Sequence, residues 1–199
     1  MTHPAPDAVR KHEMPNPRIL FLCTGNAARS VMAGAALVAT RAQVEVLTGG
    51  TLVLDGQPMS WRTRAALEHV GLTPPQHRSH QATIEDLDQA DVIIALAPEH
   101  VEWVRRTHAP AAPRTATLAR LARLLPVEPA PLTERIASML LHDVELEPWE
   151  EVVDPGGGEV PQFKACAEEI VSLIEPLARA LHTNTATANL VAGQIDRGP

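Results

Sequence analysis

Hydrophobic residues follow two different spacings along this chain. Short apolar runs, which are typical of strands buried in a sheet, predict strands at three places: residues 19–22, 44–47 and 91–96. Longer segments in which apolar residues recur every three or four positions predict helices: residues 29–42, 59–70, 99–107, 117–125, 133–141 and 162–181. Because strands alternate with helices, the expected fold class is α/β, with a parallel sheet covered by helices on both faces.

Both ends of the chain lack this pattern. Residues 1–17 contain four prolines and few apolar positions, which predicts a disordered arm. Residues 183–199 are mainly polar and predict a flexible tail. We therefore expect one domain over residues 18–182, a length that supports a single hydrophobic core.

Polar loops follow the predicted strands at Leu22 and Leu47, and a third polar loop follows Val153. In open parallel sheets, functional sites lie at the carboxyl ends of the strands. The first loop carries the most chemistry. From Cys23 it reads C-T-G-N-A-A-R-S, so an arginine and a serine stand six and seven residues after the cysteine, where a helix is predicted to begin.

A loop of small residues between a strand and a helix is suited to binding an anion. Backbone N–H groups and the helix dipole place partial positive charge there, and Arg29 adds a planar fork of donors that matches two phosphate oxygens. The same charge favours the thiolate form of Cys23, to which Ser30 could donate a hydrogen bond. The alternative, that Cys23 is only a small buried side chain, requires this spacing to arise by chance. Walker A and dinucleotide loops need residues that are missing here.

Composition narrows the functional classes. The net charge of −7 opposes binding to a nucleic-acid backbone. No apolar run reaches the ~20 residues of a membrane span, and the first residues lack the apolar segment of a secretory signal. The two cysteines stand far apart, which favours the reducing cytoplasm over a structural disulfide. We therefore expect a cytoplasmic protein that binds neither nucleic acid nor membrane, and the histidines show no metal-ligand spacing.

Four segments together resemble the low-molecular-weight protein tyrosine phosphatase family, whose fold and loop the related arsenate reductases share. C-T-G-N-A-A-R-S resembles the C-x5-R-S signature of that family. The other three segments are T-G-G-T at 48–51, A-D-V-I-I-A-L-A-P-E-H at 90–100 and V-V-D-P-G-G-G at 152–158, and they resemble its S-A-G-T, its third strand with the following helix, and its acid-bearing loop. The resemblance implies the phosphotyrosine phosphatase I-like fold, with three layers around a central parallel sheet of four strands.

The resemblance also implies roles for the matched residues. Cys23 is the nucleophile, Arg29 binds phosphate and stabilises the transition state, and Asp154 is the general acid that protonates the leaving oxygen. A thiolate displaces an alkoxide or phenoxide only if such an acid is present. No metal and no cofactor is implied, and the expected assembly is a monomer or weak dimer.

The remaining residues of the loop are implied to bind the substrate and to hold the loop in shape. Ser30 stabilises the thiolate, and Asn26 holds the unusual loop backbone with Thr48 as its partner. The predicted substrate-binding residues are Thr24, Gly25, Asn26, Ala27, Ala28 and Ser30.

The chain departs from the family pattern at several places. Family members carry aromatic residues after the D-P pair and after S-A-G-T, where the rings flank a phenyl group, but here those positions are Gly156 and residues 52–54. Ala28 replaces a second loop cysteine that protects the nucleophile in many members. Cys166 is interpreted as buried, with a resolving thiol as the alternative. The segment 126–151 is long and contains prolines, and we expect it to form part of the wall of the substrate site.

Three functions remain as hypotheses. The first is a phosphomonoester hydrolase that acts on a phosphorylated protein or a small phosphomonoester through a cysteinyl-phosphate intermediate. The alternative is an arsenate reductase that uses an external thiol, because arsenate copies phosphate and the chain has no cysteine between 24 and 165 for an internal relay. The third is a non-catalytic module for oxyanionic ligands. Asp154 separates the first two, since arsenate reduction does not require an acid at that position.

Overall fold

The computed structural model describes residues 16–194, with the side chains of its last helix described up to residue 182. The arm predicted for residues 1–17 therefore lies almost entirely outside the described residues. In the tail predicted for residues 183–199, only the backbone of residues 183–194 is described, and there the last helix continues to Gln194; residues 195–199 lie outside the described residues.

Four parallel strands form the centre of the described part of the chain. They are β1 (Arg18–Cys23), β2 (Glu45–Gly50), β3 (Val92–Ala95) and β4 (Thr115–Thr117), in the spatial order β2-β1-β3-β4. All three strand pairs are parallel, so the carboxyl ends of the strands lie at one edge. The predicted three-layer α/β fold with a parallel four-stranded sheet is confirmed.

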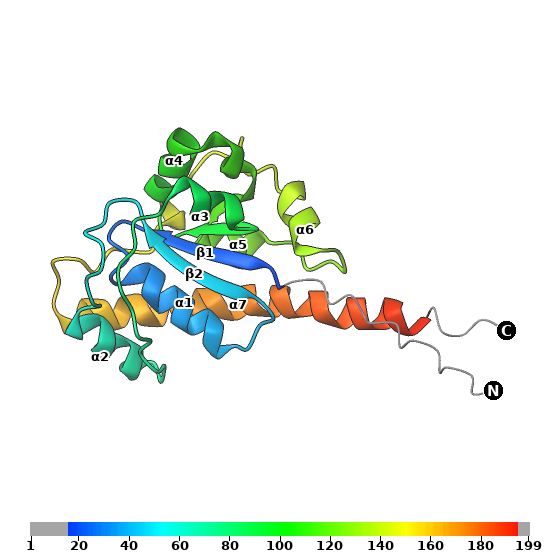
Figure 1. Cartoon of the computed structure of the whole chain (residues 1–199). Coiled ribbons are helices and arrows are strands. Elements are labelled where there is room, and N and C mark those ends of the chain that lie inside the picture. The colour runs from blue at the N-terminus through cyan, green and yellow to red at the C-terminus, as the bar shows by residue number, and fades with distance from the viewer. Residues whose placement is uncertain (1–15, 195–199) are drawn as a thin grey trace, which may run out of the picture.

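Helices cover both faces of this sheet (Figure 1). One face carries α1 (Arg29–Ala39), α2 (Trp61–His69), α5 (Leu118–Leu124) and α7 (Val160–Gln194). The other carries α3 (Ile84–Gln89), α4 (Pro98–Thr107) and the 3₁₀ helix η1 (Ala109–Arg114). The connection between α5 and α7 holds α6 (Leu132–Ser138) and the 3₁₀ helix η2 (Pro148–Glu150).

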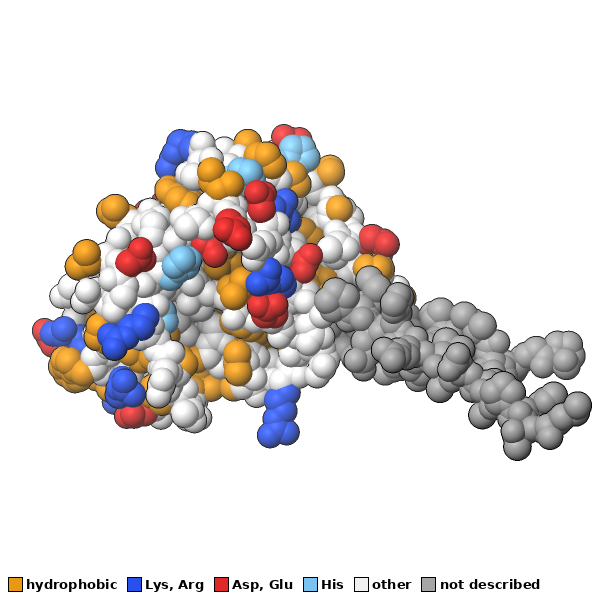
Figure 2. All heavy atoms as spheres, viewed as in Figure 1, with side chains coloured by type: hydrophobic (Ala, Val, Ile, Leu, Met, Phe, Trp, Pro, Cys, Tyr) orange, Lys and Arg blue, Asp and Glu red, His pale blue; other side chains and the backbone are white. Residues whose placement is uncertain are grey.

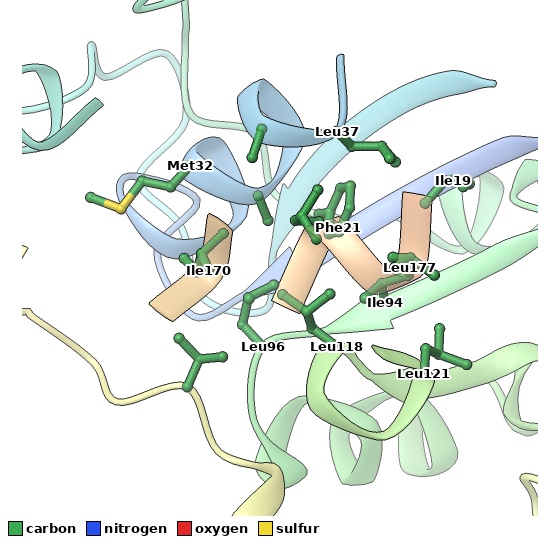
Figure 3. Close-up of a cluster of buried hydrophobic side chains, with 14 of the residues drawn as sticks. Ile19, Phe21, Met32, Leu37, Ile94, Leu96, Leu118, Leu121, Ile170 and Leu177 are labelled. Atoms are coloured by element: carbon green, nitrogen blue, oxygen red, sulfur yellow. The ribbon is translucent and has the colours of Figure 1, made fainter. Parts of the chain in front are cut away.

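Successive side chains of β1 point to opposite faces and so divide the core in two. Ile19 and Phe21 pack into the larger cluster with α1 and α7, which Figure 3 shows in close-up. Leu20 and Leu22 pack into the smaller cluster with α3 and α4. This alternation of a fully buried strand explains the continuous apolar run in the sequence.

Several elements differ from the predicted boundaries. β2 continues through Gly49 and Gly50, where the sequence indicated its end. β4 is only three residues long and was not predicted, because its position is set by pairing with β3 rather than by an apolar run. α3 was also missed, although Thr83 and Asp86 form a capping box at its start.

The loop before α7 reaches the carboxyl edge without becoming a strand. The backbone N–H of Val152 donates to the carbonyl of Leu96, just beyond β3, at 2.9 Å. This bond brings the residues after Val152 to the same edge as the loop after β1. No described helix is long and apolar enough to cross a lipid bilayer.

Candidate active site

The loop between β1 and α1 holds Cys23 beside Ser30. Cys23 is 3% exposed, and its Sγ lies 3.1 Å from Ser30 Oγ. Ser30 Oγ also accepts a hydrogen bond of 2.9 Å from the side-chain amide of Asn26. Because the amide is the donor in that bond, the hydroxyl proton of Ser30 is available for the sulfur. This arrangement stabilises negative charge on Cys23.

Asn26 adopts a left-handed backbone conformation, with φ of 47°, and is fully buried. Asparagine tolerates this region better than most residues. The side-chain oxygen of Asn26 accepts a hydrogen bond from the backbone N–H of His80 at 2.8 Å. Its backbone carbonyl accepts one from Nε2 of His77 at 2.6 Å. Since a carbonyl only accepts, His77 must carry a proton on Nε2. The segment before α3 therefore holds the loop in shape.

Thr48 is not among the partners of Asn26 in the described part of the chain. Asn26 bonds to Ser30, His77 and His80 instead. Thr48 lies on β2, where its methyl group packs against Gly34 of α1. The structure therefore places Thr48 behind the loop as a packing residue.

Two further contacts restrain the backbone of the loop between β1 and α1. A Cβ on Gly50 would lie 2.6 Å from the Thr24 carbonyl oxygen and 2.9 Å from the Asn26 nitrogen, so only glycine fits beside this backbone. On the other side, the hydroxyl of Thr63 on α2 donates to the Ala27 carbonyl at 2.9 Å. The backbone of the loop is thus fixed before any ligand binds.

Arg29 and Asp154 meet at the mouth of the loop although they are far apart in the sequence. Nη2 of Arg29 lies 2.5 Å from Oδ2 of Asp154, and Nη1 donates to the Val152 carbonyl at 3.3 Å. The other Asp154 oxygen accepts from the backbone N–H of Gly156 at 2.8 Å. Arg29 is almost completely buried, whereas the Asp154 side chain is 50% exposed. An incoming anion can therefore reach this pair from the solvent side.

His100, in the first turn of α4, completes the buried surroundings of the loop. Its Nε2 lies 3.0 Å from the hydroxyl oxygen of Thr24. Burial lowers the pKa of His100 to about 4, with a further lowering from the charge of Arg29 and an opposing effect of Asp154. The imidazole is therefore neutral at neutral pH.

Cys166 lies on α7 and is buried. Burial raises the pKa of its thiol to about 12, and Glu169 adds to this effect. A thiol with such a pKa carries almost no thiolate at neutral pH and reacts poorly. The buried interpretation of Cys166 is confirmed.

The structure thus brings Cys23, Arg29 and Asp154 together, with Ser30 and Asn26 behind the sulfur. Sequence reasoning missed the contributions of His77, His80, His100 and Thr63, and that of Glu99, whose Oε1 lies 3.4 Å from the Thr24 hydroxyl. The available signal was weak. His100 and Glu99 directly follow the third predicted strand, at the edge where a site was expected, but nothing in the sequence indicates which residues face the loop.

The sequence is similar to those of known phosphatases. The sequence model of the family described as low molecular weight phosphotyrosine protein phosphatase matches residues 18–122. A protein-arginine-phosphatase of Geobacillus stearothermophilus is 29% identical over 167 residues, which are 83% of this chain and 97% of the relative. A probable low molecular weight protein-tyrosine-phosphatase, EpsP, of Ralstonia nicotianae is 30% identical over 53% of this chain and 71% of the relative.

Solved structures resemble the fold over most of the chain. The YwlE arginine phosphatase from Geobacillus stearothermophilus matches with a TM-score of 0.66 and 26% identity, covering 92% of this chain and 98% of that structure. A low molecular weight protein tyrosine phosphatase from T. tengcongensis matches with a TM-score of 0.64 and 26% identity, covering 81% and 97%.

Proposed function

The chain belongs to the low molecular weight phosphotyrosine protein phosphatase family and is a phosphatase, and we propose that it works through a covalent phosphoryl intermediate on Cys23. The observation that carries this proposal is the convergence of three groups at one edge of the sheet. Cys23 Sγ lies beside the Ser30 hydroxyl, and Arg29 contacts Asp154 at 2.5 Å across the loop. We assign the catalytic domain to residues 18–182.

The proposed first step transfers the phosphoryl group to sulfur. The Cys23 thiolate attacks phosphorus, an S–P bond forms, and the bond from phosphorus to the leaving atom breaks while Asp154, protonated at this stage, gives that atom its proton. Arg29 and the loop N–H groups hold the equatorial oxygens. In the second step Asp154 takes a proton from water, which attacks phosphorus and releases phosphate and the thiolate.

The ion pair between Asp154 and Arg29 has to break before the phosphoryl group binds. The pair occupies the guanidinium edge that a phosphate would need, and Arg29 Nη1 is already on the Val152 carbonyl. Because Asp154 is half exposed, its carboxylate can turn into solvent, and the incoming phosphoryl group then replaces it as the counter-charge of the buried Arg29. A dianionic phosphoryl group offers Arg29 a stronger bidentate partner than one carboxylate oxygen.

For the substrate we propose phosphoarginine in proteins. Exposed aliphatic side chains, Leu52, Leu54 and Val153, stand in the loops beside the site, and Gly156 follows the D-P pair, so a phenyl ring finds no flat walls there. Figure 2 shows isolated hydrophobic side chains over the loop after β2. The Glu99 carboxylate lies 3.4 Å from the Thr24 hydroxyl, which suits a cationic guanidinium next to the phosphoryl group. The arginine phosphatase relatives support this choice.

The test compares four substrates on one preparation: an aryl phosphate, a phosphotyrosine peptide, a phosphoarginine peptide of the same sequence, and arsenate with glutathione. We expect the highest kcat/KM for the phosphoarginine peptide. A preference for the phosphotyrosine peptide would contradict the substrate assignment and leave the mechanism intact. Arsenate reduction faster than every hydrolysis would support the arsenate reductase instead.

Cys23→Ser tests the nucleophile directly. It should abolish turnover, while phosphate binding measured by calorimetry stays within a few-fold of wild type, because the binding groups are backbone N–H and Arg29. Cys166→Ser is the matched control, since it removes the other buried thiol, and it should keep full activity. Substantial hydrolysis by Cys23→Ser would remove the sulfur from the mechanism.

A further inference from the structure

His100 is a buried polar side chain that the proposed chemistry leaves unused. It is 1% exposed and lies in the first turn of α4, at the same edge of the sheet as the loop after β1. Its Nε2 contacts the Thr24 hydroxyl at 3.0 Å, while its Nδ1 is buried with no hydrogen-bond partner in the described part of the chain. Leaving a buried polar atom unsatisfied is unfavourable, so fold stability alone does not explain a histidine here.

The Thr24 hydroxyl stands between His100 and Arg29. Nη2 of Arg29 donates to Thr24 Oγ1 at 3.3 Å. A guanidinium has no acceptor, so the oxygen of Thr24 must accept this bond and its single proton must point elsewhere. Two acceptors are in reach: Nε2 of His100 at 3.0 Å and Oε1 of Glu99 at 3.4 Å.

Of these two acceptors, His100 is the nearer and the better shielded. Oε1 of Glu99 also lies 3.3 Å from Nε2 of His100, but the Glu99 side chain is 68% exposed and its carboxylate is hydrated, whereas the ring of His100 is fixed inside the protein. The groups that face the ring are Glu99 from α4, Arg29 from α1 and Asp154 from the loop before α7. A neutral ring offers Nε2 a lone pair for the Thr24 proton, while a protonated ring would place a second cation beside Arg29.

We propose that His100 is a positioning residue, which holds the Thr24 hydroxyl turned so that it accepts from Arg29 and keeps the guanidinium aimed at the phosphoryl site. The proposal rests on the phosphatase mechanism above. The role of His100 matters most when the phosphoryl group displaces Asp154, because among the described residues Arg29 then keeps only Thr24 and the Val152 carbonyl as fixed hydrogen-bond partners. A small misplacement of such a group costs about tenfold to a hundredfold in rate.

A double-mutant cycle tests this chain of contacts. We would prepare His100→Leu, Thr24→Val and the double variant in the full-length protein, with His100→Asn as the conservative variant that retains an acceptor. His108→Leu is the matched control, because His108 caps the far end of the same helix and pairs with Asp88. The readouts are kcat and KM for an aryl phosphate, the Kd for vanadate, and the melting temperature.

We expect His100→Leu to lower kcat/KM by about tenfold to a hundredfold, and His100→Asn to restore most of this loss. The double variant should be no slower than Thr24→Val alone, because without the hydroxyl there is nothing for His100 to orient. The melting temperature of His100→Leu should stay unchanged or rise, since an unsatisfied polar atom is removed. His108→Leu should keep wild-type kinetics.

Other outcomes separate the two proposals. Additive losses in the cycle, or a loss of activity that follows a fall in melting temperature, would overturn the role of His100 while the phosphatase mechanism stands. A wild-type protein that binds vanadate but hydrolyses none of the phosphates would overturn the mechanism. In that case the same cycle, measured as vanadate Kd, would still support His100 by non-additivity or overturn it by additivity.

Discussion

Two arginine–carboxylate pairs in this molecule have the same chemistry and different surroundings. Arg29 pairs with Asp154 at the carboxyl edge of the sheet, and Arg120 of α5 pairs with Glu150 of η2. Both arginines are largely buried. The carboxylates differ, because the Asp154 side chain is 50% exposed and the Glu150 side chain is 0% exposed.

The surrounding hydrogen bonds explain what each pair can do. Glu150 also accepts from the Thr117 hydroxyl at 2.6 Å and from the backbone N–H of Glu147 at 2.9 Å, so its oxygens are saturated inside the protein. Asp154 has one backbone donor and faces solvent. A sealed pair stabilises the junction of α5 and η2, whereas an open pair can be exchanged for a ligand. Mutations in the two pairs should therefore affect different properties.

The largest effect is expected for Asp154→Asn. It should slow the hydrolysis of phosphates with poor leaving groups by about 10²–10⁴, the contribution of a positioned acid. A nitrophenyl phosphate should be slowed much less, because a nitrophenolate leaves without a proton. Single-turnover rates of phosphoenzyme formation against leaving-group pKa measure this. An unchanged slope would remove Asp154 from the mechanism, with Asp143 and Glu151 as the next acids to test.

Arg29→Lys changes the buried partner of the Arg29–Asp154 pair. A lysine keeps the charge but cannot make two parallel hydrogen bonds to equatorial oxygens. We expect kcat/KM for an aryl phosphate to fall by about 10²–10³, as when one oxyanion donor is lost. A fall of less than tenfold would show that the guanidinium does not contact the transition state.

Glu150→Gln should lower the stability of the fold and leave the activity nearly unchanged. It leaves Arg120 with an uncompensated, mostly buried charge, for which about 3 kcal/mol of unfolding free energy is a typical loss. That corresponds to roughly 6–12 °C in Tm for a chain of this size. The aryl phosphatase kcat/KM should remain within a few-fold of wild type. The control is Glu168→Gln, which breaks the exposed pair with His69 and should cost less than about 1 kcal/mol. Equal losses in both variants would contradict the distinction between sealed and exposed pairs.

The smallest expected effect is a pH dependence of the difference in stability between wild type and Glu150→Gln. Burial alone raises the pKa of Glu150, but hydrogen bonds from Arg120, Thr117 and a backbone N–H lower it below the ordinary value of 4.5. A carboxyl with a lowered pKa stabilises the fold above its ordinary pKa, and this contribution is lost as the pH falls through the folded value. The Tm difference between wild type and Glu150→Gln should therefore be constant near neutral pH and shrink below about pH 4.5. A difference that grows in acid would contradict the assignment.

Local sequence determined the layers of the fold and the chemistry of the loop. The apolar runs and helical spacings follow from burial on two faces of a sheet or on one face of a helix, so they are readable without knowing the neighbours. The spacing of Cys23, Arg29 and Ser30 is likewise local, because one strand–loop–helix unit contains all three. β4 was not readable, since three residues are too few to show a period.

Only the tertiary structure decided which distant residues meet this loop. Asn26 is held by the segment before α3 rather than by Thr48, and Thr24 meets His100 across 76 residues. Asp154 reaches Arg29 because Val152 bonds to the end of β3, a contact 56 residues apart. Such contacts depend on packing and on hydrogen-bond satisfaction among buried groups, and these act through space without leaving a period in the sequence. The sequence determined the reactive loop and, through the family resemblance, indicated the acid, whereas the fold determined how Asp154 reaches Arg29 and which buried groups, Glu150 and His100 among them, surround the sheet edge.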